Sequence, residues 1–218
     1  MKIPVNPKMN QLSNIFIWIF SLRKEGGIRT LLSIIRRPFK LRRALKLRSV
    51  SEATFIGITG SSGKSTTTAL LSHILGSNGR VRSQVLDNLY NGLLKTMSSL
   101  EAQDDFVVVE TAVAKHGDMA PQVELLKPDV AIVTMIGIEH YSAFRSKEAV
   151  AQEKSALVRS LTSSGLAILN ADDPLVMQMA SKTKARCITY GWSESADYRI
   201  TRTAGKFPDA LKIWLGGF

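Results

Sequence analysis

The hydrophobic pattern of the chain changes at residue 54. From there on, short apolar runs rich in β-branched residues alternate with longer segments of helical periodicity. The predicted strands are residues 54–59, 106–110, 130–136, 166–170 and 185–190. The predicted helices are residues 64–76, 89–101, 119–126, 147–161 and 174–182.

These strands are apolar nearly throughout rather than at alternate positions, which is typical of strands that are covered on both faces. The pattern therefore predicts an α/β fold, with a mostly parallel open sheet and helices on both of its faces. In such a fold ligands bind beyond the carboxyl ends of the strands.

The first 50 residues have a different pattern. An apolar run at residues 15–20 is far shorter than the roughly 20 residues that span a bilayer. After it, Ile28, Leu31, Leu32 and Ile35 follow the i, i+3, i+4, i+7 spacing of an amphipathic helix. We expect Pro38 to break this pattern. We divide the chain into a basic amphipathic helical leader, residues 1–50, and an α/β domain, residues 51–218.

The net charge of +11 is confined to this leader. Residues 1–50 hold 12 of the 29 Lys and Arg residues and one of the 18 acidic residues. Residues 51–218 hold the remaining 17 of each kind, so the charge of the domain is zero. We therefore expect no nucleic-acid partner for the domain, and two interpretations of the leader stay open. It lies on an anionic membrane surface, or it folds back on the domain with its basic face in water.

The cysteine content bears on the compartment. Cys187 is the single cysteine and cannot form an internal disulfide, and no stretch has the form of a secretory signal. The sequence predicts a reducing, cytoplasmic location, peripheral on the inner face of the membrane if the leader binds lipid.

A glycine-rich loop between the first predicted strand and helix carries the strongest chemical signal. Glycines let the backbone fold around a phosphate, and the helix that follows supplies N–H groups and a positive dipole. The predicted nucleotide contacts are Thr59, Gly60, Ser61, Ser62, Gly63, Lys64, Ser65 and Thr66. Lys64 is expected to neutralise the β- and γ-phosphates and Ser65 to reach Mg²⁺. The alternative is a Gly/Ser turn followed by an exposed lysine.

This loop departs from the general P-loop pattern because Ile58 stands where the first glycine would be. The pattern present, T-G-x-x-G-K-S-T, resembles that of the Mur ligase superfamily. Further segments extend the resemblance over residues 54–192. The segment that begins at Glu110 resembles E-x-G-x-x-x-x-G-E-[MI], with Ala112 replacing the first glycine. The segment that begins at Thr134 resembles T-N-I-G-x-[DE]-H, with Met135 replacing Asn. The segment that begins at Leu169 matches L-N-x-D-D-P.

The resemblance implies the roles of several residues. Glu110, at the end of a predicted strand, and His140 fall at metal-binding positions of the family, with Glu139 as a weaker supporting carboxylate. Residues 87–92 resemble a degraded form of the loop that contacts substrate in the members that add D-alanyl-D-alanine, which makes Asn88 and Asn91 candidate substrate contacts. Taken alone, Glu110 could be solvated and His140 could be a surface or packing residue.

Lys154 is informative by its position alone. On a helix over residues 147–161, steps of 100° place Lys154 beside the apolar stripe of Val150, Leu157 and Leu161. Its side chain could snorkel outward to water. Mur ligases carry a lysine at this point, carbamoylated in many members, whose carboxylate helps to hold the second Mg²⁺. The resemblance thus implies catalytic roles for Lys64, His140 and Lys154, and a metal site made of Ser65, Glu110, His140 and Lys154.

The activity implied by the resemblance is ATP-dependent ligation of a carboxylate to an amine, through an acyl phosphate and with two Mg²⁺ ions. The substrates would be small molecules, with cell-wall peptide precursors as the leading candidates. The chain ends before the segment that holds adenine in the family, so we expect the domain to be incomplete at its C-terminus and the chain alone to be inactive in ligation. The alternatives are a membrane-associated ATP-binding remnant, a ligase of the folate or poly-amino-acid type, or an ordinary P-loop NTPase, which Ile58 disfavours.

Overall fold

The computed structural model describes residues 27–85, 90–138, 141–205 and 212–216, with side chains from residue 37 onward except Tyr141. The chain divides into two compact units, Met1–Arg43 and Ala44–Phe218. Helix α2, Gly27–Val50, contains Pro38 in its interior, so the expectation that Pro38 breaks the helix is wrong. A proline removes one hydrogen bond and crowds one carbonyl, which can bend a helix without ending it.

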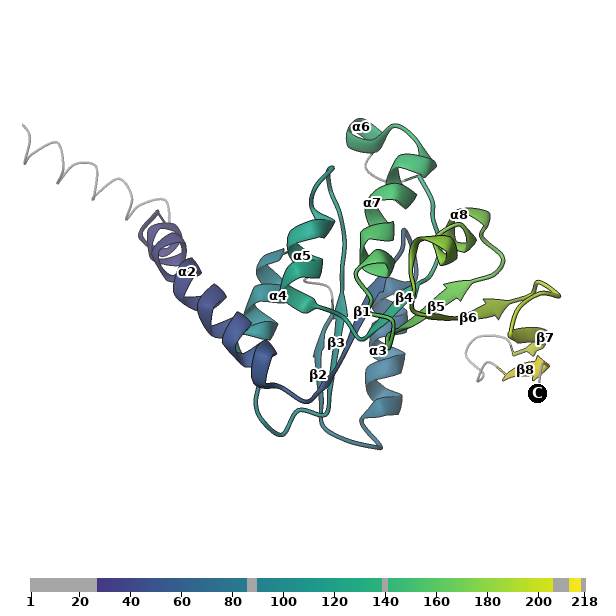
Figure 1. Cartoon of the computed structure of the whole chain (residues 1–218), viewed down its shortest axis with the longest axis horizontal. Helices are drawn as coiled ribbons and strands as arrows, with labels where there is room; N and C mark the ends of the chain where they lie inside the picture. The colour runs from purple at the N-terminus through teal and green to yellow at the C-terminus, as the bar shows by residue number, and fades with distance from the viewer. Residues whose placement is uncertain (1–26, 86–89, 139–140, 206–211, 217–218) are drawn as a thin grey trace, which may run out of the picture. The chain divides into compact units, whose positions relative to one another are not determined.

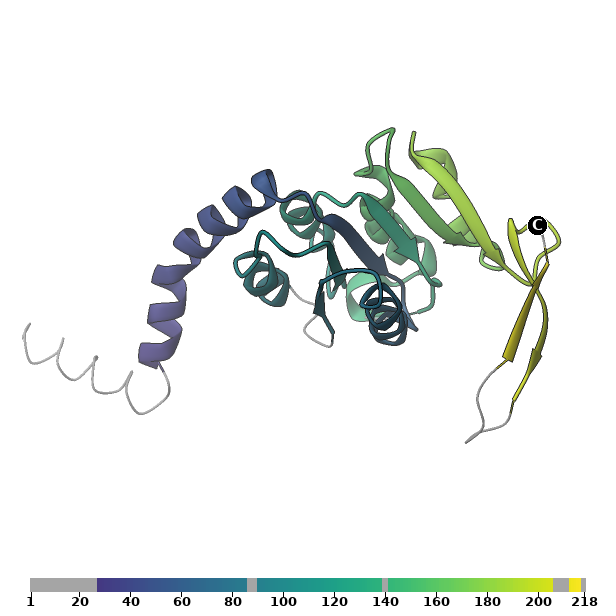
Figure 2. The ribbon, with the colours of Figure 1, turned by 90° about the horizontal axis from the view of Figure 1, so that it is seen from below.

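The larger unit is built on an eight-stranded sheet (Figure 1). Its order is β2-β3-β1-β4-β5-β6-β7-β8, and every neighbouring pair is parallel except β7 and β8. Figure 2 shows the β7–β8 hairpin extending from the end of the parallel sheet. The strands are β1 Thr54–Thr59, β2 Val81–Gln84, β3 Phe106–Glu110, β4 Val130–Val133, β5 Leu166–Asn170, β6 Arg186–Gly191, β7 Tyr198–Ala204 and β8 Lys212–Gly216.

The helices of this unit follow the predicted order, with the short helix α6 in addition. They are α3 Lys64–Leu75, α4 Tyr90–Met97, α5 Met119–Leu126, α6 Tyr141–Phe144, α7 Lys147–Arg159 and α8 Pro174–Met177, followed by a 3₁₀ turn at Ala180–Lys182. The α/β fold class and the mostly parallel sheet are confirmed. The predicted helix over residues 174–182 is instead a short α-helix and a separate 3₁₀ turn.

Helices cover both faces of the sheet. On one face, Leu71 and Leu75 of α3 pack against the buried Ile56, Ile58, Val108 and Ile132. On the other, a Cβ atom added to Gly57 would lie 2.8 Å from Leu157 of α7 and 3.0 Å from Leu126 of α5. This division follows from right-handed crossovers. The chain moves in one direction along the sheet from β1 to β2 through α3, and in the opposite direction through the later helices. A reversal of direction places the connecting helices on the opposite face.

The last two turns of α2 belong to the larger unit. Ala44 is fully buried. The Arg48 guanidinium lies 3.8 Å from the centre of the Phe55 ring. It donates to the carbonyls of Leu126 (2.8 Å) and Lys127 (2.6 Å) at the end of α5. A cation at a helix C-terminus is favoured by the helix dipole, so these contacts hold residues 44–50 against the sheet domain.

Candidate functional site

The loop between β1 and α3 has a backbone that requires glycine. Gly60 has a φ of 143° and Gly63 a φ of 80°, both in the region that side chains disfavour. A Cβ atom at Gly60 would lie 1.9 Å from the hydroxyl oxygen of Thr134. Helix α3 starts directly after Gly63, at Lys64. The first turn of a helix offers unpaired N–H groups to an anion, so the loop has the form of a phosphate-binding site.

Three hydrogen bonds fix this loop against residues 134–137, which follow β4. Ser61 donates its N–H to the Met135 carbonyl (2.7 Å) and its hydroxyl to the Gly137 carbonyl (3.2 Å). Thr134 donates its hydroxyl to the Ser62 carbonyl (2.6 Å). Ser61, predicted as a nucleotide contact, therefore uses both of its donors to hold the loop in place.

Lys64 and Lys154 meet at one carbonyl. The Gly60 oxygen accepts a hydrogen bond from Lys64 Nζ (2.8 Å) and another from Lys154 Nζ (3.1 Å). The Lys154 side chain is fully buried in α7. The snorkelling alternative for Lys154 is therefore wrong, and the structure brings this lysine to the phosphate loop.

Ser65 and Glu110 also lie together. Ser65 donates its hydroxyl to Glu110 Oε2 at 3.1 Å, and Glu110 is fully buried at the carboxyl end of β3. The Thr59 hydroxyl donates to the carbonyl of Thr111, and the Thr111 N–H donates to Ile58, which aligns the ends of the two strands. A carboxylate beside a hydroxyl offers the hard oxygen atoms that Mg²⁺ prefers, so these residues fit a magnesium ion.

Four further predicted site residues are Glu139, His140, Asn88 and Asn91. Glu139, His140 and Asn88 lie outside the described residues. Asn91 is exposed on α4. Within the part of the chain that the structure describes, no three His, Cys, Asp or Glu residues gather in the manner of a metal site. The placement of His140 beside Glu110 and Lys154 stays a prediction.

Two residues that sequence reasoning missed organise the loop after Glu110. Gln122 of α5 donates to the carbonyls of Ala112 (2.7 Å) and Asp118 (2.8 Å). Glu153, next to Lys154, accepts the N–H of Met119 at the start of α5 (3.0 Å). A buried Gln on a helix is a weak signal in a sequence, because its partners are carbonyl groups that any residue type supplies.

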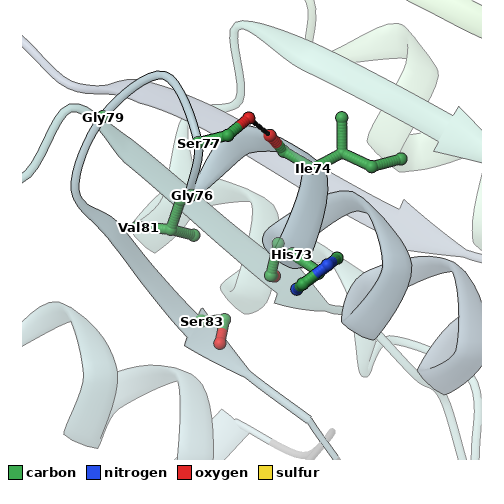
Figure 3. Close-up of a pocket in the computed structure, with 8 residues that line it drawn as sticks. His73, Ile74, Gly76, Ser77, Gly79, Val81 and Ser83 are labelled. Atoms are coloured by element: carbon green, nitrogen blue, oxygen red, sulfur yellow. Dashed lines mark hydrogen bonds between the residues drawn. The ribbon is translucent and has the colours of Figure 1, made fainter.

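A separate groove of about 880 Å³ lies at the other end of α3. His73, Ile74, Gly76 and Ser77 line one side of it, and the start of β2 lines the other (Figure 3). The lining begins at Ser72, eight residues after Lys64 at the start of α3, which is about 12 Å along the helix. The groove shares no residue with the phosphate loop, so it is not part of the candidate site.

Comparisons with known proteins show the family of the chain. The sequence model of the Mur ligase middle domain matches residues 58–214. The chain belongs to the Mur ligase family. It is 36% identical over 146 residues to the UDP-N-acetylmuramoyl-tripeptide–D-alanyl-D-alanine ligase of Mycobacterium tuberculosis. The aligned residues are 66% of this chain and 28% of the relative. The Bacillus subtilis ligase of the same name is 31% identical over 147 residues, which covers 66% of this chain and 31% of the relative.

Solved structures of Mur ligases share the fold. MurF of Thermotoga maritima in complex with ADP superposes with a TM-score of 0.71 at 22% identity, over 82% of this chain and 44% of that one. MurF of Acinetobacter baumannii gives a TM-score of 0.72 at 21% identity, over 84% of this chain and 42% of that one. The chain thus spans less than half the length of these Mur ligases, and under a third of the two curated relatives above.

The contact between Gly60 and Thr134 leads to a prediction about stability. Gly60→Ala should lower the free energy of unfolding by at least about 2 kcal/mol more than Gly117→Ala, because overpacking adds to the cost of a positive φ. Gly117 also has a positive φ, of 86°, but has no atom within 4 Å of an added Cβ. Urea denaturation of the two variants measures the difference. Equal losses would show that the loop can move away from Thr134.

Proposed function

We propose that this chain carries the nucleotide-binding core of an ATP-dependent ligase that joins a carboxylate to an amine, in the synthesis of cell-wall peptide precursors. The observation that carries the proposal is the cluster around the phosphate loop, where Lys64 and Lys154 share the Gly60 carbonyl. Ser65 and Glu110 meet beside it. Family membership supports the same conclusion.

Residues 59–66 would form the site for the phosphates of ATP, with Ser61 holding the loop in place and Lys64 neutralising part of the phosphate charge. Ser65, Glu110, His140 and a carbamoylated Lys154 would hold two Mg²⁺ ions. The metals would supply charge stabilisation for phosphoryl transfer from ATP to the substrate carboxylate. The residues of this chain contribute by placing charge and by fixing the loop before the nucleotide arrives.

The arrangement of the two lysines supports carbamoylation of Lys154. Two ammonium groups that donate to one carbonyl lie close enough to repel each other. In carbamoylation the neutral amine of Lys154 attacks carbon dioxide, a C–N bond forms and a proton is released, which leaves a carbamate anion. The modification would replace the repulsion by an attraction to Lys64 and to a metal ion.

The substrates are proposed from the relatives. Several bear the name of a ligase that joins UDP-N-acetylmuramoyl-tripeptide to D-alanyl-D-alanine. Asn88 and Asn91 are the proposed substrate contacts. A ligase of the folate or poly-amino-acid type is the alternative within the family, because Escherichia coli FolC, solved with ADP, has the same fold with a TM-score of 0.54 at 18% identity.

The leader suggests a second role, association with an anionic membrane surface. It holds the whole net charge of +11, and Phe39 is 68% exposed beside the exposed Lys40. An apolar side chain among cations is typical of a helix that lies on an anionic lipid surface. Among the described residues, no helix is long and apolar enough to cross a bilayer.

Nucleotide binding is the direct test of the proposed function. The Lys64→Ala variant should raise the Kd for Mg·ATP by about tenfold or more, since a charged hydrogen-bond donor to phosphate is lost. Lys95→Ala is the matched control, because Lys95 is exposed on α4 and should leave the Kd unchanged. Isothermal titration calorimetry measures both. No binding by the unmodified chain, or equal affinity of both variants, would contradict the proposal.

Carbamoylation has its own test. With isotopically labelled bicarbonate and Mg²⁺, the chain without substitutions should show a carbamate carbon signal by NMR. This signal should be missing from the Lys154→Arg variant. A guanidinium stays protonated and cannot attack carbon dioxide. The same signal should persist in Lys95→Arg. A signal that persists in Lys154→Arg would assign the modification to another amine.

Vesicle binding tests the leader. Replacing the exposed Lys40, Arg42, Arg43 and Lys46 by Gln should weaken binding to anionic vesicles by about 1 kcal/mol per residue. The control replaces four exposed lysines of the domain, Lys95, Lys115, Lys147 and Lys184, and should bind as the unmodified chain does. Sedimentation with neutral and anionic vesicles measures both. Equal binding to the two lipids would contradict the electrostatic interpretation and support the alternative, a leader that folds back on the domain with its basic face in water.

A further inference from the structure

The Met135–Ile136 peptide group joins the phosphate loop to a distant turn. Its carbonyl accepts the N–H of Ser61 (2.7 Å). Its N–H donates to Asp173 Oδ2 (2.6 Å). The two bonds are made by opposite ends of one planar peptide group, whose atoms cannot move independently. A carboxylate that accepts from the N–H also polarises the group, which strengthens the carbonyl as an acceptor.

A second bond supports the same segment. Asn170 donates its side-chain amide to the Thr134 carbonyl (2.8 Å), and Thr134 donates its hydroxyl to Ser62 (2.6 Å). Strand β4 ends at Val133, and the Thr134 N–H still donates to the Thr59 carbonyl of β1 (3.0 Å). Beyond that bond, the contacts with Asn170 and Asp173 hold the segment. The phosphate loop therefore rests on a segment that the 170–173 turn holds in place.

The turn itself is firmly anchored. Asp173 Oδ1 accepts the N–H groups of Leu175 (2.9 Å) and Val176 (3.3 Å) and caps α8. Asp172 accepts the N–H groups of Trp192 (2.9 Å) and Ser193 (2.8 Å), which follow β6. The turn thus takes its position from β5, β6 and α8, and can serve as a fixed support.

We propose that Asp173 and Asn170 are positioning residues for the phosphate loop and act through the Met135–Ile136 and Thr134 carbonyl contacts. The inference rests on the proposed function, since it assigns these residues an effect on nucleotide affinity. The hydrogen bonds of these two side chains go to residues 134 and 136 and to their own turn, and none goes directly to the loop. Their effect is to preorganise it, so that the loop is already ordered when the phosphates bind.

Two substitutions separate this role from helix capping. Asp173→Asn and Asp173→Ser both keep a side chain that caps helices well, but neither keeps two carboxylate oxygens for α8 and Ile136 at once. The matched control is Asp197→Asn. Asp197 accepts the N–H and the hydroxyl of Thr189, both at 2.8 Å. These side-chain and backbone bonds hold the pKa of Asp197 below its ordinary value. Asp197 is thus also a hydrogen-bonded carboxylate in a turn, but its bonds go to Thr189 and not to residues 134–137.

Hydrogen exchange of the nucleotide-free 218-residue chain is the first measurement. The Ser61 amide should exchange about tenfold faster in both Asp173 variants, as expected when a charge-assisted bond is lost. The second is the Kd for Mg·ATP, which should rise by a similar factor. Asp197→Asn should change neither, even where it lowers the urea midpoint as much as the Asp173 variants do.

The outcomes are distinguishable. If Ser61 exchange and the Kd stay unchanged in folded Asp173 variants, Asp173 is only a helix cap and the inference is overturned. If the unmodified chain binds no nucleotide, the proposed function fails, while the exchange rates still decide whether Asp173 positions the loop. If Asp197→Asn also accelerates exchange at Ser61, the effect is a general loss of stability and the inference is overturned.

Discussion

The absence of a side chain at Gly60 is the constraint on which the rest of the site depends. The backbone there passes so close to Thr134 that no other residue fits. This close contact lets the loop form hydrogen bonds with residues 134–137. The carbonyl of the same residue accepts hydrogen bonds from Lys64 and Lys154. The close approach between the ends of β1 and β4 thus occurs at the residue where the two lysines meet.

Most of the sheet could be predicted from the sequence because its central strands are apolar on both faces. Strand β2, Val81-Arg82-Ser83-Gln84, was missed since it is short, polar and at the sheet edge. Strands β7 and β8 were missed for related reasons. Strand β7 carries polar residues at many positions, β8 is short, and both strands are largely exposed. Covered strands have a strong hydrophobic signal, whereas edge strands do not.

The end of β4 shows where the sequence pattern reaches its limit. The apolar run continues to Ile136, but the strand ends at Val133. The Thr134 N–H still bonds to Thr59 of β1, whereas the peptide groups after it bond to Ser61, Asn170 and Asp173. The place of Lys154 beside an apolar stripe left burial and snorkelling both open, and the structure shows burial. Its partner could not be predicted, since Gly60 lies 94 residues earlier in the chain. The roles of the site residues remain predictions.

The anchoring of Arg48 has a consequence for the order of folding. Its partner carbonyl, on Leu126, lies 78 residues further along the chain. During synthesis from the N-terminus, Arg48 leaves the ribosome long before α5 exists, and contacts between distant residues form only after the intervening chain has been made. The end of α2 therefore cannot pack against α5 until those residues have been translated. Over that interval the nascent leader is accessible to any anionic surface near the ribosome.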